Sequence, residues 1–239
     1  IAKQQTDQTK PVQVAVGEPG TNNWKAASLD PVTFAGKLDD ATKNWKQIAG
    51  SFEMTLQNTQ VKGQQVGTFM IEDRSLYKIE YVDIEHPTGP NLVRADGQNR
   101  VVLHGKDPMK KTPVAQLGNA TEAKRFYTLF SRQVFETFTE GRPTWKPIME
   151  NLENDGFNIT LESKNMESGG VMRPFYRLIA TKPGIGLNAF EARFVGIRLI
   201  PLTMKMKATD PKGKPIVAEW RSIWNFNQKV KDKLVAKKP

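Results

Sequence analysis

The stretch SFEMTLQ, residues 51–57, alternates polar and apolar side chains with a period of two. Successive side chains of a β-strand point to opposite faces, so Phe52, Met54 and Leu56 share one face of a strand. Gly50 lies directly before the stretch and marks a break between this strand and the preceding segment. A strand with one apolar face needs a covering layer, and the rest of the chain can be interpreted from that requirement.

An amphipathic helix is predicted before this strand. Asp30 followed by Pro31 is typical of a helix N-cap and of the first helical residue. Apolar residues then recur at spacings of three and four, as expected for one face of a helix that runs to about Ala49 and is ended by Gly50. These apolar residues are Phe34, Leu38, Ala41, Trp45 and Ile48.

Strand patterns continue on both sides of a predicted helical insert. Further strands of the first half are predicted at 66–72, 76–82, 92–95 and 100–104, with Asp96-Gly97 as a hairpin turn between the last two. A loop at 106–118, a helix that begins at Asn119 and ends near Gly141, and a short helix at 144–152 form the insert. Strands of the second half are predicted at 157–162, 175–181, 190–195, 202–208 and 216–226.

These elements predict one α+β domain. We expect about ten strands in a single, strongly curved antiparallel sheet, a half-barrel, covered by the leading helix and the insert. The absence of βαβ alternation argues against doubly wound and TIM-barrel folds. We expect residues 1–30 to form a polar flexible leader, residues 31–227 the domain, and residues 228–239 a basic tail. The leader would either tether the domain to an upstream anchor or be a disordered end.

The composition favours binding over catalysis. The 239 residues include no cysteine and two histidines, which excludes disulfides, thiolate nucleophiles and zinc fingers. No nucleophile-elbow pattern lies near His86 or His104, and the sequence has no HExxH motif. Glu136 and Glu140 are four residues apart, a spacing at which two carboxylates usually lie on a solvated helix face. We therefore expect no enzymatic activity, no metal site and no cofactor.

The strands carry many large, adaptable apolar side chains at alternate positions. On a curved sheet such residues could line a concave cavity for acyl chains, whereas an ordinary packed core would use the same residue types. The candidate cavity residues are Phe52, Met54, Leu56, Phe69, Ile71, Tyr77, Ile79, Tyr81, Leu202, Met204, Met206, Trp220 and Trp224.

Several short segments resemble the lipoprotein carriers of the LolA/LolB-like superfamily. They are Gly67-Thr68-Phe69-Met70-Ile71, the strand from Leu76 to Tyr81, the hairpin from Asp96 to Val102, and Leu199-Ile200-Pro201-Leu202 before a Trp- and Phe-rich last strand. The resemblance covers roughly residues 30–227. It implies a half-open antiparallel barrel capped by helices, which holds lipid or lipoprotein acyl chains and carries them through the bacterial cell envelope, in the periplasm.

The sequence departs from the carrier pattern at the turn after the second strand. The carriers have Arg-Pro there, whereas this chain has Asp73-Arg74-Ser75. The resemblance makes Arg74 an approximate counterpart of the arginine that governs lid opening. The insert and the leader make this chain longer than the plain carriers, and any lipid-modified cysteine of the natural protein would lie upstream of Ile1.

Positive charge is concentrated near the C-terminus. The formal net charge is +10, and the segment 203–239 holds ten Lys or Arg against three Asp or Glu. We expect this tail to dock on anionic membrane surfaces, unless it is merely a solvated end. The lysines concerned are Lys229, Lys231, Lys233, Lys237 and Lys238.

Two other functions compete with lipid carriage. The basic charge is compatible with nucleic-acid binding, but no RNP-like, KH or helix-turn-helix signature accompanies it. The same fold could also serve as a structural or sensory module that binds another envelope protein, and the sequence does not distinguish this role from carriage.

Overall fold

The fold is seen in a computed structural model, which describes residues 23–58, 62–85, 89, 91–114, 135, 138–139, 141, 143–168, 170–228 and 230–235. Most of the predicted leader, His86, most of the predicted helix that begins at Asn119 and ends near Gly141, and the tail residues Lys229, Lys237 and Lys238 lie outside the described residues.

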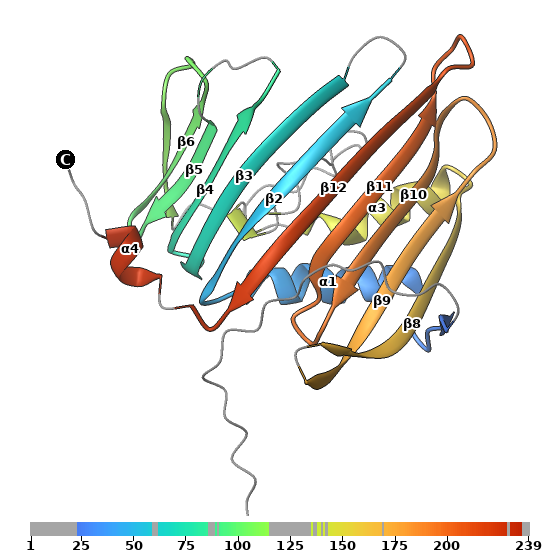
Figure 1. Ribbon diagram of the computed structural model, residues 1–239, viewed down its shortest axis with the longest axis horizontal. Helices are drawn as coiled ribbons and strands as arrows, with labels where there is room; N and C mark the ends of the chain where they lie inside the picture. Colours follow the sequence, from blue (N-terminus) through green and yellow to red (C-terminus); the bar gives the residue numbers. More distant parts are fainter. Residues whose placement is uncertain are drawn as a thin grey trace, which may run out of the picture.

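The described strands form one antiparallel sheet of 12 strands, in the order β1-β8-β9-β10-β11-β12-β2-β3-β4-β5-β6-β7. The sheet curves across its width and does not close, and helices α1 and α3 lie on one side of it (Figure 1). The predicted α+β class with a curved half-barrel sheet is therefore confirmed. The strands are β1 (Lys25–Ala26), β2 (Ile48–Gln57), β3 (Lys62–Asp73), β4 (Leu76–Asp83), β5 (Asn91–Asp96), β6 (Asn99–His104), β7 (Lys110–Pro113), β8 (Asn158–Ser168), β9 (Val171–Thr181), β10 (Gly186–Val195), β11 (Ile200–Thr209) and β12 (Pro215–Phe226).

Helix α1 (Pro31–Lys43) begins as predicted, because the Asp30 side chain accepts a hydrogen bond from the Thr33 amide at 2.8 Å. The prediction that this helix runs to about Ala49 is wrong. It ends at Lys43, and strand β2 already begins at Ile48, where the chain pairs with both β12 and β3. Trp45 and Ile48 are buried as the periodicity predicts, but sheet pairing overrides the helical spacing there.

Both ends of the described chain extend the predicted domain. Residues 23–30 of the expected leader include strand β1, which pairs with β8. The Trp24 ring also lies under the Lys164 ammonium, 4.4 Å from the ring centroid. At the other end, Val230 is buried and helix α4 (Lys231–Val235) packs beside β4.

A buried carboxylate joins the two helices that cover the sheet. Asp39 of α1 accepts hydrogen bonds from the backbone amides of Thr144 and Trp145, each at 2.9 Å, and from that of Lys146 at 3.0 Å. These amides form the N-terminus of α3 (Trp145–Asn154), where the Thr144 side chain makes no capping bond. Asp39 therefore caps α3 from a distant part of the chain, and it satisfies three donors that would otherwise be buried without acceptors.

Replacing this carboxylate should destabilise the fold. We expect Asp39→Ala to lower the free energy of unfolding by about 2–4 kcal/mol, because the α3 amides lose their acceptor in a buried setting. Urea denaturation would measure the change. Asp40→Ala is the matched control, since the Asp40 side chain is 78% exposed and pairs only with Lys43 in the described residues, and it should cost about 0.5 kcal/mol or less. Equal losses in the two variants would contradict the capping role.

Two glycines in the central strands are covered by aromatic rings. Gly67 of β3 lies opposite Phe52, and Gly50 of β2 lies opposite Phe69. A Cβ atom at Gly67 would lie 2.6 Å from the carbonyl oxygen of Glu80 and would overlap the Phe52 ring. The missing side chains let each ring lie across the neighbouring backbone, an arrangement that permits strong sheet curvature.

Gly67→Ala should therefore destabilise the protein by about 1–3 kcal/mol through overpacking. Gly36 in α1 provides the opposite case, since a Cβ atom there would meet nothing within 4 Å. Gly36→Ala should stabilise by about 0.5–1 kcal/mol, because alanine favours the helix. Thermal and urea unfolding of both variants would test the pair, and a neutral Gly67→Ala would contradict the close ring-on-glycine packing.

Candidate functional site

The sequence-predicted cavity residues lie on one face of five neighbouring strands. In the sheet order these strands are β11, β12, β2, β3 and β4. Trp220 lies opposite both Met204 and Met54 in the register, and Phe52 lies in line with Gly67 and Tyr81. We call this apolar surface the inner face, because the covering segments pack on it. The structure thus brings together all the side chains that the alternation pattern selected.

Burial on the inner face decreases along the strands. Phe52 is 3% exposed, whereas Leu56, four residues further along β2, is 37% exposed. Met54 and Met206 are partly buried beside them. The inner face is therefore closed near the start of β2 and more open near its end. The fully buried members are Phe52, Phe69, Ile71, Tyr77, Ile79, Tyr81, Leu202, Met204, Trp220 and Trp224.

Different segments cover the two halves of the inner face. Phe34 of α1 and Trp145 of α3 both contact Phe194 of β10, with ring centroids 5.6 and 5.4 Å apart. The helices therefore cover the β8–β10 side. Two aromatic residues of the insert, Phe135 and Phe138, cover the strands that carry the candidate cavity.

Phe135 and Phe138 fill the centre of the inner face. The Phe135 ring centroid lies 5.1 Å from that of Phe69 and 5.8 Å from that of Phe52, and the Phe138 centroid lies 5.0 Å from that of Tyr77. Both rings are almost completely buried. These two residues are not among the cavity residues predicted from the sequence. Their spacing of three residues, typical of one helix face, is the signal that could have identified them.

Arg74 lies against the end of the insert. The Asp73 carboxylate accepts hydrogen bonds from the Ser75 and Leu76 amides at 2.7 and 3.1 Å, which shapes the β3–β4 turn. The Arg74 guanidinium packs on Gly141, where a Cβ atom would lie 3.0 Å from one terminal nitrogen and closer to the other. The Arg74 Nε atom is buried without a hydrogen-bond partner. Arg74 is therefore a cation that contacts the insert near the predicted end of its first helix.

One donor on the inner face also lacks an acceptor. Trp220 is fully buried, and its indole nitrogen makes no hydrogen bond. A buried N–H without an acceptor costs free energy, which a ligand carbonyl or carboxylate oxygen at this position would recover. The arrangement can therefore offer a polar contact to a ligand on a mainly apolar surface.

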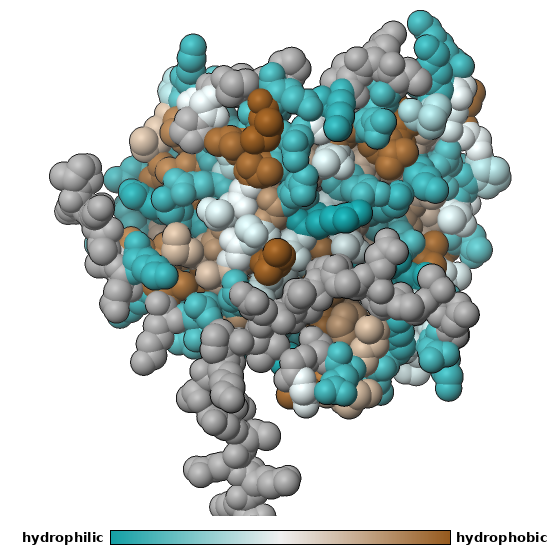
Figure 2. All heavy atoms as spheres, viewed as in Figure 1, coloured by the Kyte–Doolittle hydropathy of each residue, from teal (hydrophilic) through white to brown (hydrophobic). Residues whose placement is uncertain are grey.

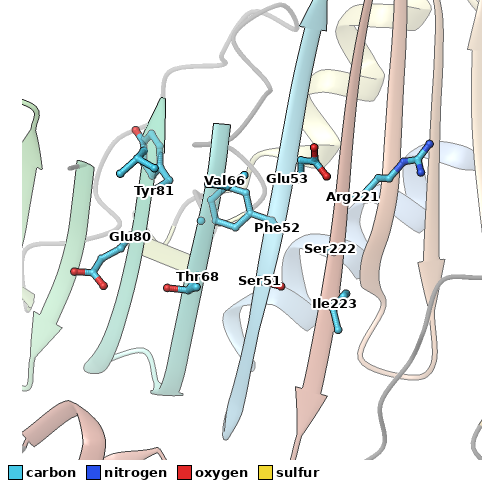
Figure 3. Close-up of a pocket in the computed structure, with 12 residues that line it drawn as sticks. Ser51, Phe52, Glu53, Val66, Thr68, Glu80, Tyr81, Arg221, Ser222 and Ile223 are labelled. Carbon is cyan, nitrogen blue, oxygen red and sulfur yellow. The ribbon is translucent and has the colours of Figure 1, made fainter. Parts of the chain in front are cut away.

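The opposite, outer face of the sheet has a groove of about 750 Å³. Figure 3 shows Glu80, Thr68, Glu53, Arg221 and Ile223 around it, on strands β4, β3, β2 and β12. The space-filling view of this side is mainly hydrophilic, with a few separate apolar patches (Figure 2). The outer face thus carries many of the polar side chains that alternate with the apolar ones along these strands.

Ion pairs cross the outer face beside this groove. Glu219 bonds to Lys205 at 2.5 Å and to Arg221 at 3.2 Å. Hydrogen bonding to Lys205 is the main cause that holds the pKa of Glu219 below its usual value. Burial lowers the pKa of the Lys164 ammonium, and the nearby charges of Arg193 and Arg177 lower it further. The two ion pairs of Glu219 thus place charged groups on the solvent-facing surface of the sheet beside the groove.

Within the described residues, no group of three or more His, Asp or Glu side chains is arranged to hold a metal ion. The described helices are also too short or too polar to span a bilayer.

Neither protein-family models nor curated proteins match this sequence, whereas solved structures do. A LolA superfamily protein from Nitrosomonas europaea is 8% identical, with a TM-score of 0.32 over 88% of this chain and 99% of the other. The match to the MucA/MucB complex of Pseudomonas aeruginosa is 14% identical, with a TM-score of 0.43, over 87% of this chain and 62% of the other. A putative outer membrane lipoprotein-sorting protein domain from Vibrio parahaemolyticus is 10% identical, with a TM-score of 0.29 over 80% and 89%.

One of these solved structures is a LolA superfamily protein, and all three TM-scores are below 0.5. This chain spans only about 62% of the chain that it matches in the MucA/MucB complex.

Proposed function

We propose that this protein is a non-catalytic cell-envelope protein that binds acyl chains of a lipid or lipoprotein on the inner face of β11, β12, β2, β3 and β4. The observation that carries the proposal is the way this face is covered. Phe135 and Phe138 of the insert, rather than a second layer of strands, occupy its centre. A ligand that displaced these two rings would find a continuous surface of aromatic and methionine side chains.

Displacement of the two rings sets a minimum ligand length. Burial of a phenylalanine side chain contributes about 1.5–3 kcal/mol, and each buried methylene contributes about 0.8 kcal/mol. An acyl chain must therefore bury roughly four to eight methylenes to replace both rings. Long-chain lipids meet this requirement, and short soluble acids do not.

Two features indicate how an acyl chain would be oriented in the proposed cavity. The inner face is most open beside Leu56 and Met206, near the end of β2, so an acyl chain would enter there. The unpaired indole N–H of Trp220 would donate to a carbonyl or carboxylate oxygen of the ligand. The chain terminus would then extend past Phe52 toward Phe69 and Trp224.

Probe binding to the wild type and to Phe135→Ala would test the proposal. We expect the wild type to bind a fluorescent long-chain fatty acid and to retain lipid in native mass spectrometry. Phe135→Ala should bind the probe roughly tenfold more tightly or better, because less aromatic burial is lost on displacement. Met109→Ala is the control, since Met109 is 63% exposed on a loop. Absence of probe binding to both proteins would refute the proposal.

We further propose that Arg74 holds Phe135 and Phe138 over the inner face through its contact at Gly141. Arg74→Ala should then accelerate probe association, because the two rings would leave the face more readily. Stopped-flow mixing would measure the rate, with Arg94→Ala as a control on the neighbouring strand β5. An unchanged association rate in a folded Arg74→Ala protein would assign Arg74 to the turn alone.

A binding module for another envelope protein is the second candidate. It is favoured by the outer groove, which combines Glu53, Glu80 and Arg221 with exposed apolar atoms of Ile223 and Val82. Under this alternative the inner face would be a permanent core, and Phe135→Ala would lower stability without creating probe binding. The same titration therefore distinguishes the two functions.

A further inference from the structure

Three exposed apolar side chains of the described residues lie at the same end of the neighbouring strands β9, β10 and β11. Ile197, in the β10–β11 turn, is 93% exposed, and Val171 and Met172, at the start of β9, are 52% and 63% exposed. The Gly196 amide donates to the Pro174 carbonyl at 2.8 Å, which joins the two hairpins side by side. We call Val171, Met172 and Ile197 the apolar edge.

The backbone holds Ile197 outward. The flanking Leu199 is buried, and the carbonyl of Arg198 accepts a hydrogen bond from the Trp45 indole at 3.3 Å. The Arg198 guanidinium donates to the Lys46 carbonyl at 3.1 Å. A turn anchored at so many points cannot fold Ile197 back onto the protein, so this side chain stays in water unless something covers it.

Basic residues surround the apolar edge. Arg173 follows Met172 directly, and Arg198, whose guanidinium lies at the Lys46 carbonyl, follows Ile197. The acidic residue Glu167 lies opposite Met172 in the register, so cations outnumber acids at this position. Helix α4, with exposed Lys231 and Lys233, lies at the same end of the sheet (Figure 1). Apolar tips within a basic margin are complementary to an anionic lipid surface, whose headgroups attract cations and whose acyl region accepts apolar groups.

We propose that the apolar edge docks this protein on anionic phospholipid bilayers, with Ile197 and Met172 inserted among the lipids. This assignment differs from docking by the tail lysines alone, and it does not depend on acyl-chain binding by the inner face. The lysines of α4 would then supplement the edge from the same side of the molecule.

The chain carries a matched control for this proposal. Ile185 is 71% exposed in the β9–β10 turn, and it flanks the same strand, β10, at its other end. The two isoleucines are therefore about 33 Å apart along the strand. Only one of them can lie in the plane of a membrane that contacts the apolar edge.

The absence of cysteine allows each position to be labelled cleanly. Full-length Ile197→Cys and Ile185→Cys would carry an environment-sensitive fluorophore and be mixed with vesicles of phosphatidylcholine alone or with phosphatidylglycerol. We expect a blue-shifted, brighter signal at position 197, only with phosphatidylglycerol, and no change at position 185. Equal signals at both positions, or no change at position 197 while the protein co-sediments with vesicles, would overturn the proposal.

Co-sedimentation of charged variants gives a second readout. Ile197→Asp and Met172→Asp should each weaken binding to the anionic vesicles about tenfold, and Ile185→Asp should leave it unchanged. Since all three positions are exposed, circular dichroism should show folded proteins in each case. No binding of the wild type to any vesicle would refute the proposal, and would leave the edge as a surface for a protein partner.

Discussion

The pairing of β12 with β2 is the constraint on which the rest of the structure depends. Ten residue pairs, from Val217–Gln57 to Phe226–Ile48, join β12, the last described strand along the chain, to β2, the first long strand along the chain. Without this ladder the strands β2–β7 and β8–β12 would be two separate sheets. The inner face would then be divided between Trp220 and Trp224 on one side and Phe52 and Met54 on the other. The central aromatic surface exists because this long-range pairing is made.

In the proposed function, the inner face serves both stability and binding with the same side chains. Phe69 packs against Trp224 and Phe135 at ring centroid distances of 4.3 and 5.1 Å, so it belongs to the aromatic core. In the proposed function, a ligand replaces only the part of this core that Phe135 and Phe138 supply. The sheet and the helices α1 and α3, tied together by Asp39, would keep the fold intact during that exchange. A cover that is separate from the scaffold is what makes such an exchange compatible with a marginally stable domain.

Charge and apolar exposure are distributed unevenly over the remaining surface. On the outer face, acids and bases pair across strands, as Glu162 does with Arg177 and Glu219 with Lys205. At the edge that carries Ile197, basic residues are instead next to exposed apolar tips. The distribution of charge along the sequence indicated the C-terminal tail as a docking surface. The folded chain adds a second candidate docking surface, formed by turns that are distant from the tail in sequence.

Local patterns in the sequence determined the strand faces, the start of α1 at Asp30-Pro31 and the Asp96-Gly97 turn, because each depends on residues within a few positions of one another. The composition also shows that the chain has no cysteine and only two histidines. Only the tertiary structure decided that α1 ends at Lys43, that Asp39 caps a helix more than a hundred residues away, and that Phe135 lies on Phe69. The exposure of Ile197 was likewise not predictable, since a single isoleucine in a turn has no periodicity. Such features arise from contacts between segments that the chain brings together only on folding, and no local pattern encodes which distant partner a side chain will meet.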